Sequence, residues 1–376
     1  GSRYAVVSDG DRNTITLNDG AAIENTNTLY GDYNYAAVGL FTETGSDLTL
    51  NGGSRIVMNG GTDNSHYDNF SFRGVYAQGQ NIDITLNGAS TITVYGIGTE
   101  GENKYAGVVF LDSSTTASTR SSIVLNGAST VNVIGSYASD GNDLIGIIAA
   151  GQGYSSYTPT VVLNGASSVN VEGHLGTSNN KYIGIEAIGR DAGVTLNGGS
   201  SVNVTGDGGG ANNKYLGLVA IDYSESDGFS QVTLNGGSSV NITSGAGSTD
   251  ATMAGILSKG YTEGKSVVLN GGSSVVLTSY GDSSVILGIE NVGLGVVTEL
   301  NGASSIQINA LGEGDGNKYI GVLNFELSES AAGAGRITLN GGSSVTLQGG
   351  ASTNTKYVGI LSFGIYPPGK YTSDVT

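Results

Sequence analysis

A Lys-Tyr pair recurs in this chain at one place in a repeated pattern, with the tyrosine two residues ahead of a glycine. The chain has only 15 basic residues, and five of them belong to these pairs. Regularly spaced ammonium groups can meet the sulfates or carboxylates of an acidic polymer, and tyrosine rings can stack on sugars. The candidate ligand-binding residues are Lys104, Tyr105, Asn180, Lys181, Tyr182, Asn213, Lys214, Tyr215, Lys318, Tyr319, Lys356 and Tyr357.

A second motif, Leu-Asn-Gly followed by Gly or Ala and Ser, sets the period of the chain. Its asparagines are separated by 31 to 39 residues, after a degenerate first copy at Asn18. Repeats of this length indicate a solenoid. The motif asparagines are Asn51, Asn87, Asn126, Asn164, Asn197, Asn235, Asn270, Asn301 and Asn340.

Three short runs of alternating apolar residues accompany each motif, one before it, one after it and one around the glycine that follows Lys-Tyr. Alternation with period two and many β-branched residues predicts strands. Leucine-rich repeats would be shorter and carry a helical segment, and propeller blades would have four strands. We therefore predict an all-β fold, a right-handed parallel β-helix of about ten repeats, each of roughly 36 residues, with three strands per coil. Residues 1–376 form one domain, with an irregular first coil at 1–17, the repeats at 18–363 and a tail at 364–376.

Side-chain directions follow from the alternation. In the first two strands, Val and Leu positions such as Val204 and Leu234 should face inward, and asparagines such as Asn203 should face outward. The Leu-Asn-Gly asparagines should turn the corner in a left-handed conformation and stack their amides as a ladder. In the third strand we expect the residues flanking the glycine to face inward, which places the glycine and the tyrosine two residues before it on the outside.

Length variation concentrates after the third strand, which predicts loops that project at one corner of the rod. This outer face could serve as a groove for an extended ligand or as a surface on which the loops pack. One role does not exclude the other. The long segments are 112–122, 149–160, 222–231 and 324–336, and an insert at 62–72 contains His66.

Composition excludes several classes of function. A net charge of −17 argues against nucleic acid or an anionic membrane as the main partner. The carboxylates Asp112, Asp191, Asp222, Glu186 and Glu290 are scattered over several coils, and among them only Asp191, next to Arg190 and near Glu186, brings opposite charges close. His66 and His174 lie in polar loops. No nucleophile elbow, phosphate loop or zinc spacing occurs. We expect no enzymatic activity, no cofactor and no metal.

The repeat at 194–204, Val-Thr-Leu-Asn-Gly-Gly-Ser-Ser-Val-Asn-Val, resembles the passenger domains of bacterial autotransporter adhesins of the diffuse-adherence type. The resemblance covers residues 18–363 and concerns β-helix motifs. It implies a signal peptide upstream, a translocating C-terminal β-barrel as a partner downstream, and display on the surface of a Gram-negative cell. Proteins of this family bind host glycans or matrix proteins such as fibronectin, or self-associate through polar ladders.

Two functions therefore follow as expectations. The first is an adhesin that binds host matrix glycans of the glycosaminoglycan class, or matrix proteins. The alternative is self-association leading to bacterial aggregation and biofilm formation, which the like charge of two acidic rods opposes unless salt screens it.

Overall fold

The computed structural model describes most of the chain as β-strands, with one short 3-10 turn, η1 (Ala117–Thr119). The described residues are 2–29, 34–43, 45–61, 72–99, 101–136, 140–153, 156–174, 177–207, 209–224, 230–263, 266–281, 285–312, 316–326, 335–349, 354–364 and 374–375.

The strands form three long sheets, which we call A, B and C, and one small sheet. Sheet A contains β1 (Ser2–Asp9), β4 (Asn34–Thr42), β7 (Phe72–Gly79), β10 (Lys104–Asp112), β13 (Asp143–Gly151), β16 (Lys181–Ile188), β20 (Lys214–Asp222), β24 (Thr252–Glu263), β27 (Val285–Leu294), β30 (Lys318–Glu326) and β33 (Lys356–Gly364). Sheet B contains β2 (Asn13–Leu17), β5 (Ser46–Leu50), β8 (Ile82–Leu86), β11 (Ser122–Leu125), β14 (Thr160–Leu163), β17 (Gly193–Leu196), β21 (Gln231–Leu234), β25 (Ser266–Leu269), β28 (Val297–Leu300), β31 (Arg336–Leu339) and β34 (Asp374–Val375). Sheet C contains β3 (Ala22–Leu29), β6 (Arg55–Gly60), β9 (Thr91–Gly96), β12 (Thr130–Gly135), β15 (Ser168–Gly173), β18 (Ser201–Gly206), β22 (Ser239–Ser244), β26 (Ser274–Ser279), β29 (Ser305–Ala310) and β32 (Ser344–Gly349). The small sheet pairs β19 (Gly210–Ala211) with β23 (Ser248–Thr249).

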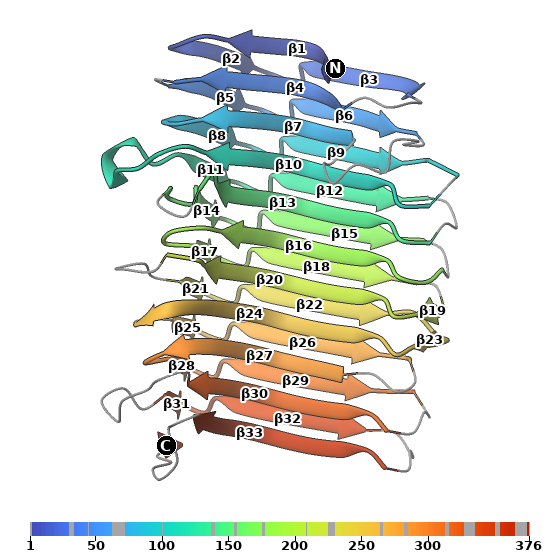
Figure 1. Ribbon diagram of the computed structural model, residues 1–376, viewed down its shortest axis with the longest axis vertical. Helices are drawn as coiled ribbons and strands as arrows, with labels where there is room; N and C mark the ends of the chain where they lie inside the picture. The colour runs from blue at the N-terminus through green and yellow to red at the C-terminus, as the bar shows by residue number, and fades with distance from the viewer. Residues whose placement is uncertain are drawn as a thin grey trace.

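Each coil visits sheets B, C and A in turn and then enters sheet B of the next coil. Figure 1 shows the resulting rod, in which the chain winds in a right-handed sense and each strand lies beside its counterpart one coil away. Like strands pair in parallel, as in the register Val204↔Ile242 of sheet C. The predicted parallel β-helix is confirmed.

The interior of the rod is one continuous apolar cluster. Val204 and Leu234 have no exposed surface and belong to it, so the predicted inward positions of the first two strands are confirmed. On the outside of sheet C, Asn203 donates to Asn170 at 2.8 Å and accepts from Asn241 at 2.9 Å. The expected outward ladder is therefore present.

The Leu-Asn-Gly asparagines join sheets B and C, and their side chains form an unbroken ladder from Asn18 to Asn340 with steps of 2.9–3.0 Å. Their predicted left-handed conformation is wrong. The positive φ angles belong to the two residues that follow, as at Gly52 (61°) and Gly53 (75°). A tight turn in which both central residues are left-handed favours glycine or another small residue at these two positions. The asparagine is the residue before them, so it keeps an ordinary negative φ.

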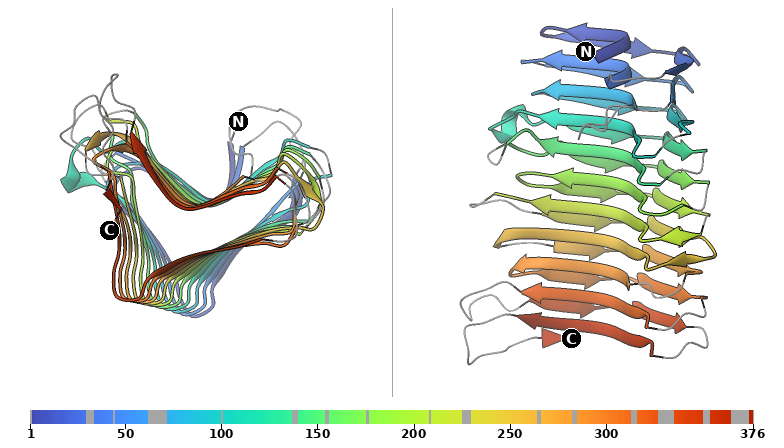
Figure 2. Two further views of the ribbon diagram at one scale, coloured as in Figure 1. Left: turned by 90° about the horizontal axis from the view of Figure 1, so that it is seen from below. Right: turned by 45° about the vertical axis from the view of Figure 1, so that its right-hand side comes forward.

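Sheet A departs from the expected alternation at its central glycine. Tyr105 and Val108 are both buried in the core cluster although they are three positions apart, which period two would place on opposite faces. A Cβ on Gly107 would lie 2.3 Å from Cγ1 of the core residue Val131, so Gly107 also faces inward. Two consecutive inward positions bend each strand of the sheet, and Figure 2 shows that the outer face of sheet A is concave. The prediction that the glycine faces outward is therefore wrong.

The long segments predicted after the third strand connect sheet A to sheet B of the next coil, and residues 154–155, 225–229 and 327–334 within them lie outside the described residues. The segment between β10 and β11 carries η1, and Asp112 accepts hydrogen bonds from the backbone of Ser114 (2.8 Å) and Ser121 (3.0 Å). Residues 62–71, including His66, and 365–373 lie outside the described residues. Beyond the expected end of the repeats, β34 pairs with β31.

Candidate functional site

The five lysines of the Lys-Tyr pairs begin strands of sheet A and form what we call the lysine row: Lys104, Lys181, Lys214, Lys318 and Lys356. Lys181 pairs in register with Lys214, and Lys318 with Lys356. Lys214, Lys318 and Lys356 are exposed. The two lysines of each pair therefore lie on adjacent coils, and both pairs lie along the edge of sheet A that faces sheet C.

The tyrosines of the pairs do not share this surface, because the shift in alternation at the glycine turns them inward. Tyr105, Tyr182, Tyr215 and Tyr319 are at most 4% exposed. The rings of Tyr182 and Tyr215 stack with centroids 5.0 Å apart, and burial raises the pKa of both hydroxyls. The predicted outward tyrosine ridge is wrong, and only Tyr357, on the last strand of sheet A, is exposed (44%).

A small residue at the end of the neighbouring sheet C strand makes room for the inward ring, and it is glycine beside Tyr105, Tyr182 and Tyr215 but Ala310 beside Tyr319. A Cβ on Gly173 would lie 2.2 Å from the Tyr182 ring, and one on Gly206 would lie 2.5 Å from the Tyr215 ring. This recurrent glycine is the signal in the sequence that could have predicted the direction of the tyrosines.

The asparagines that precede the lysines are also part of the scaffold. Asn180 and Asn213 are each 2% exposed. Asn180 Oδ1 accepts from the backbone of Asn142, and Asn213 Oδ1 accepts from the backbone of Asn180, both at 2.9 Å. These amides hold successive coils together behind the lysine row.

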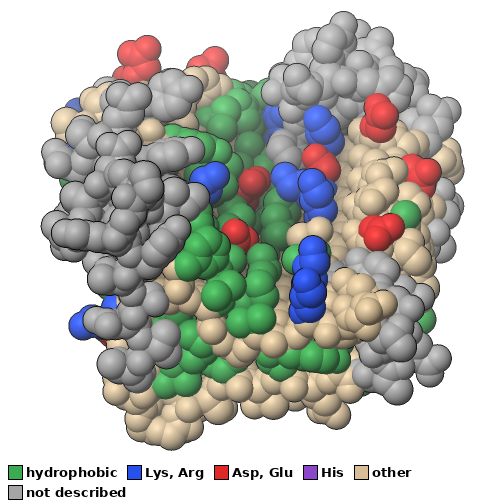
Figure 3. All heavy atoms as spheres, turned by 60° about the horizontal axis from the view of Figure 1, so that its bottom comes forward, with side chains coloured by type: hydrophobic (Ala, Val, Ile, Leu, Met, Phe, Trp, Pro, Cys, Tyr) green, Lys and Arg blue, Asp and Glu red, His purple; other side chains and the backbone are tan. Residues whose placement is uncertain are grey.

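Outward apolar side chains fill the concave centre of sheet A, and we call them the outer strip. Figure 3 shows this strip of apolar side chains with a column of basic side chains beside it. Its central members pack into a second small cluster, in which Ile145 and Ile183 have no exposed surface. The apolar side chains in the middle of the outer strip therefore bury one another. The cluster consists of Ala106, Val109, Ile145, Ile148, Ile183 and Val219, with Tyr76, Leu111, Ala150, Leu216, Ile221 and Leu257 against it.

Carboxylates interrupt both the lysine row and the outer strip. Asp143 takes the lysine position in the coil between Lys104 and Lys181. Burial raises the pKa of Asp143, while the charges of the neighbouring lysines lower it. The pKa of Glu186 is also raised, because the effect of burial exceeds the opposing effect of the Lys181 charge, whose Nζ lies 4.0 Å from Glu186 Oε1. Sequence reasoning missed Asp143, although the run Asn-Asp-Leu-Ile-Gly at 142–146 matches Asn-Lys-Tyr-Ile-Gly at 180–184.

Replacing Glu186 with glutamine should raise the thermal midpoint at neutral pH. When folding raises the pKa of a carboxyl group, that group destabilises the folded protein progressively as pH rises from the ordinary unfolded-state pKa through the raised value. The gain of Glu186→Gln should therefore shrink toward zero as pH falls below the ordinary glutamate pKa. Thermal unfolding of the variant and of exposed Glu172→Gln, followed from pH 3 to 8, checks this. An equal gain at both ends of the pH range would contradict it.

Other residues singled out in the sequence include His174 and Arg190. His174 is exposed and lies 3.1 Å from Asp207, as expected for a surface histidine. Arg190 lies over the ring of Tyr157 with its guanidinium carbon 4.6 Å from the centroid. Groups of three or more His, Cys, Asp and Glu that could hold a metal do not occur in the described ranges.

Among the residues that the structure describes, no helical segment has the length and apolar character that a bilayer crossing demands. Comparison with protein-family models, with curated proteins and with solved structures finds no match for this chain.

Proposed function

We propose that this protein is a cell-surface adhesin that binds acidic host polysaccharides of the glycosaminoglycan class through the lysine row. The observation that carries the proposal is the pairing in register of Lys181 with Lys214 and of Lys318 with Lys356. Neighbouring parallel strands are about 4.8 Å apart, so each pair presents two ammonium groups at a close and regular spacing. A polymer with repeated sulfates or carboxylates can contact several of them.

The energetics favour modest, salt-sensitive binding. An exposed ion pair contributes about 1 kcal/mol or less, so affinity must come from several contacts together. The net charge of −17 opposes approach of a polyanion except at the local excess of positive charge. Tyrosine stacking on sugar rings has no part in this proposal, since four of the five tyrosines in the Lys-Tyr pairs, all except Tyr357, are buried.

Display on a Gram-negative cell, with a translocator barrel as partner, belongs to the same proposal and rests on the repeat motifs that resemble autotransporter passengers. A rod with parallel sheets of eleven, eleven and ten strands is compatible with that architecture. Matrix proteins such as fibronectin are further partners under this proposal, for which the lysine row offers a surface complementary to acidic segments.

Replacing Lys181, Lys214 and Lys318 with alanine should abolish binding to heparin at low salt, because the variant leaves neither lysine pair intact. A matched control replaces Arg12, Arg55 and Arg336, which are exposed basic residues outside sheet A. The two variants have the same net charge. Heparin-affinity chromatography at 50 mM salt should retain the control and release the lysine variant. Equal retention of the two variants, or no retention of the unmodified protein, would contradict the proposal.

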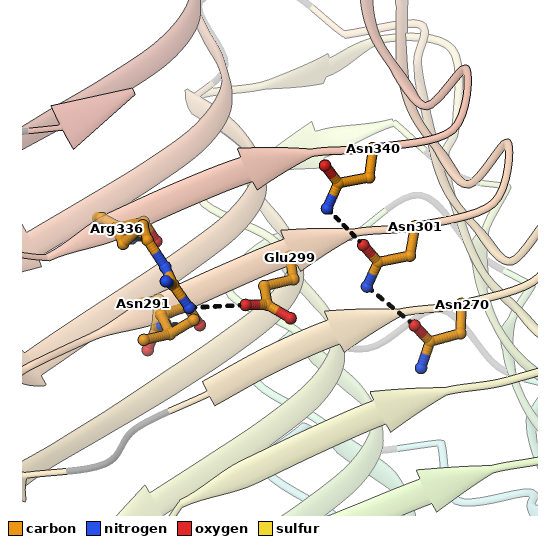
Figure 4. Close-up of polar contacts among 8 residues, drawn as sticks. Asn270, Asn291, Glu299, Asn301, Arg336 and Asn340 are labelled. Carbon is orange, nitrogen blue, oxygen red and sulfur yellow. Dashed lines mark hydrogen bonds and ion pairs between the residues drawn. The ribbon is translucent and has the colours of Figure 1, made fainter. Parts of the chain in front are cut away.

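Self-association is the alternative function, and the asparagine ladder supports it. Figure 4 shows Asn270, Asn301 and Asn340 bonded in sequence on the outside of the rod. Each side-chain amide has two N–H donors and an oxygen with two acceptor sites, and a ladder step uses one of each. The remaining capacity suits a second polar rod. Sedimentation of the protein over a range of salt concentrations tests it, since screening of like charges should promote association.

A further inference from the structure

The structure contains a second candidate binding site, away from the lysine row, at the corner between sheets A and B near the N-terminus. A cleft of about 560 Å³ runs along the ends of the strands β1, β4 and β7 and reaches Ser113 and Gln152 in the next two coils. This volume is within the range of about 300–1,000 Å³ typical of ligand pockets. Five successive coils contribute to it, so it follows the axis of the rod for roughly 20 Å.

One wall of the cleft is aromatic, with Phe41 as its lining residue and two tyrosines in support of that ring. Phe41 lines it, and the rings of Tyr4 and Tyr76 lie on either side at centroid distances of 5.4 and 5.6 Å in edge-to-face contact. Gly39 makes room for this wall, since a Cβ there would lie 2.7 Å from the Tyr4 ring. The guanidinium of Arg73 lies over Tyr76 from 4.4 Å and is buried. The wall is thus a supported apolar surface with an open ring at its centre.

Hydrogen-bonding groups form the rest of the lining. Asp11 is positioned by bonds from the Thr42 hydroxyl (3.0 Å) and the Glu43 backbone (3.1 Å). The Tyr76 hydroxyl donates to Gln78 Oε1 at 3.0 Å, which orients that amide. Asp9, Asp11 and Glu43 supply carboxylates, Gln78 and Gln152 supply amides, and none of the described lining residues is a lysine or an arginine.

We propose that this cleft binds a neutral oligosaccharide. Sugars present C–H faces that pack on aromatic rings and hydroxyl groups that donate to carboxylates and exchange hydrogen bonds with amides. Three carboxylates without a basic residue disfavour uronic acids and sulfated sugars by like-charge repulsion. The cleft therefore selects a ligand of the opposite character to the polyanion of the lysine row, and it does not depend on that row.

Isothermal titration of the whole chain with maltohexaose, cellohexaose, mannohexaose and chitohexaose tests this proposal. At least one should bind with a dissociation constant of 1 mM or below. Phe41→Ala should weaken that binding at least tenfold. Phe363→Ala is the matched control, because Phe363 lies at the equivalent position of the last strand of sheet A, is 42% exposed and packs edge-to-face on Phe325. It should bind as the unmodified protein does.

A second variant, Asp9→Ala with Gln152→Ala, removes two exposed side chains of the lining and should weaken binding at least threefold without affecting folding. Absence of binding by all four hexasaccharides at 10 mM would overturn the proposal, as would unchanged affinity in this double variant. The lysine variant described above should bind the hexasaccharide normally, and Phe41→Ala should bind heparin normally. Failure of one site is thus distinguishable from failure of the other.

Discussion

Replacing Tyr215 with alanine should lower the free energy of unfolding by about 3–5 kcal/mol, the range measured for buried aromatic residues. Tyr215 is 1% exposed, and its ring stacks on Tyr182 at 5.0 Å. Its removal leaves a cavity in the core cluster, and the hydrogen-bonded strands on either side of β20 hold that cavity open. Urea unfolding followed by circular dichroism measures the change.

Two controls separate this effect from a general sensitivity of the Lys-Tyr motif. Tyr357 occupies the same position in the last strand of sheet A but is 44% exposed, so Tyr357→Ala should cost far less. Lys214→Ala, next to Tyr215, should leave the unfolding midpoint nearly unchanged, since its side chain is exposed. A small effect at Tyr215 comparable to that at Tyr357 would mean that the tyrosines face outward.

Gly184→Ala should destabilise the rod by about 3 kcal/mol, the upper part of the range for overpacked cores. A Cβ at Gly184 would lie 2.1 Å from Val202 Cγ1 and 2.6 Å from the backbone oxygen of Gly217. The backbone of the next coil cannot move away without breaking the parallel ladder. The cost comes from space alone, because Gly184 does not have a positive φ.

Gly359→Ala is the matched control for this substitution. Gly359 is the same glycine of the repeat, and a Cβ there would have no atom within 4 Å. The free energy of unfolding of Gly359→Ala should differ from that of the unmodified protein by about 0.5 kcal/mol or less, as for ordinary surface substitutions. Equal loss of stability in both variants would indicate a backbone requirement for glycine and would contradict the inward direction of this position.

The fold could be predicted from the sequence because the period of Leu-Asn-Gly and the alternation around it act together. In sheets B and C the alternation is regular, and the inward positions of Val204 and Leu234 followed directly from it. The asparagine ladder was predictable for the same reason, since identical residues at one register position must stack. The conformation of the turn was not, because the residues after Asn51 supply the positive φ angles.

Sheet A could not be predicted in the same way, because the alternation is reset at one position of the strand, which is glycine from β7 onward and alanine in β1 and β4. Simple period two places Tyr182 and Ile185 on opposite faces, whereas both are in the core. Of the candidate residues, Lys214, Lys318 and Lys356 are exposed, whereas the four tyrosines ahead of the last coil, with Asn180 and Asn213, are part of the scaffold. The cleft near Phe41 combines residues from five coils, and no local pattern in the sequence identifies such an assembly.

The central proposal, that the lysine row binds an acidic polysaccharide, is tested most directly by observing the lysines themselves. Reductive ¹³C-methylation labels each lysine while keeping its charge, and single Lys→Arg variants assign the resonances. On addition of a heparin hexasaccharide, the methyl signals of Lys181, Lys214, Lys318 and Lys356 should shift, and added salt should reverse the shifts. The signal of Lys259, which lies in sheet A outside the row, should stay in place. Shifts confined to Lys259 and other lysines outside the row, or no shifts at all, would contradict the account.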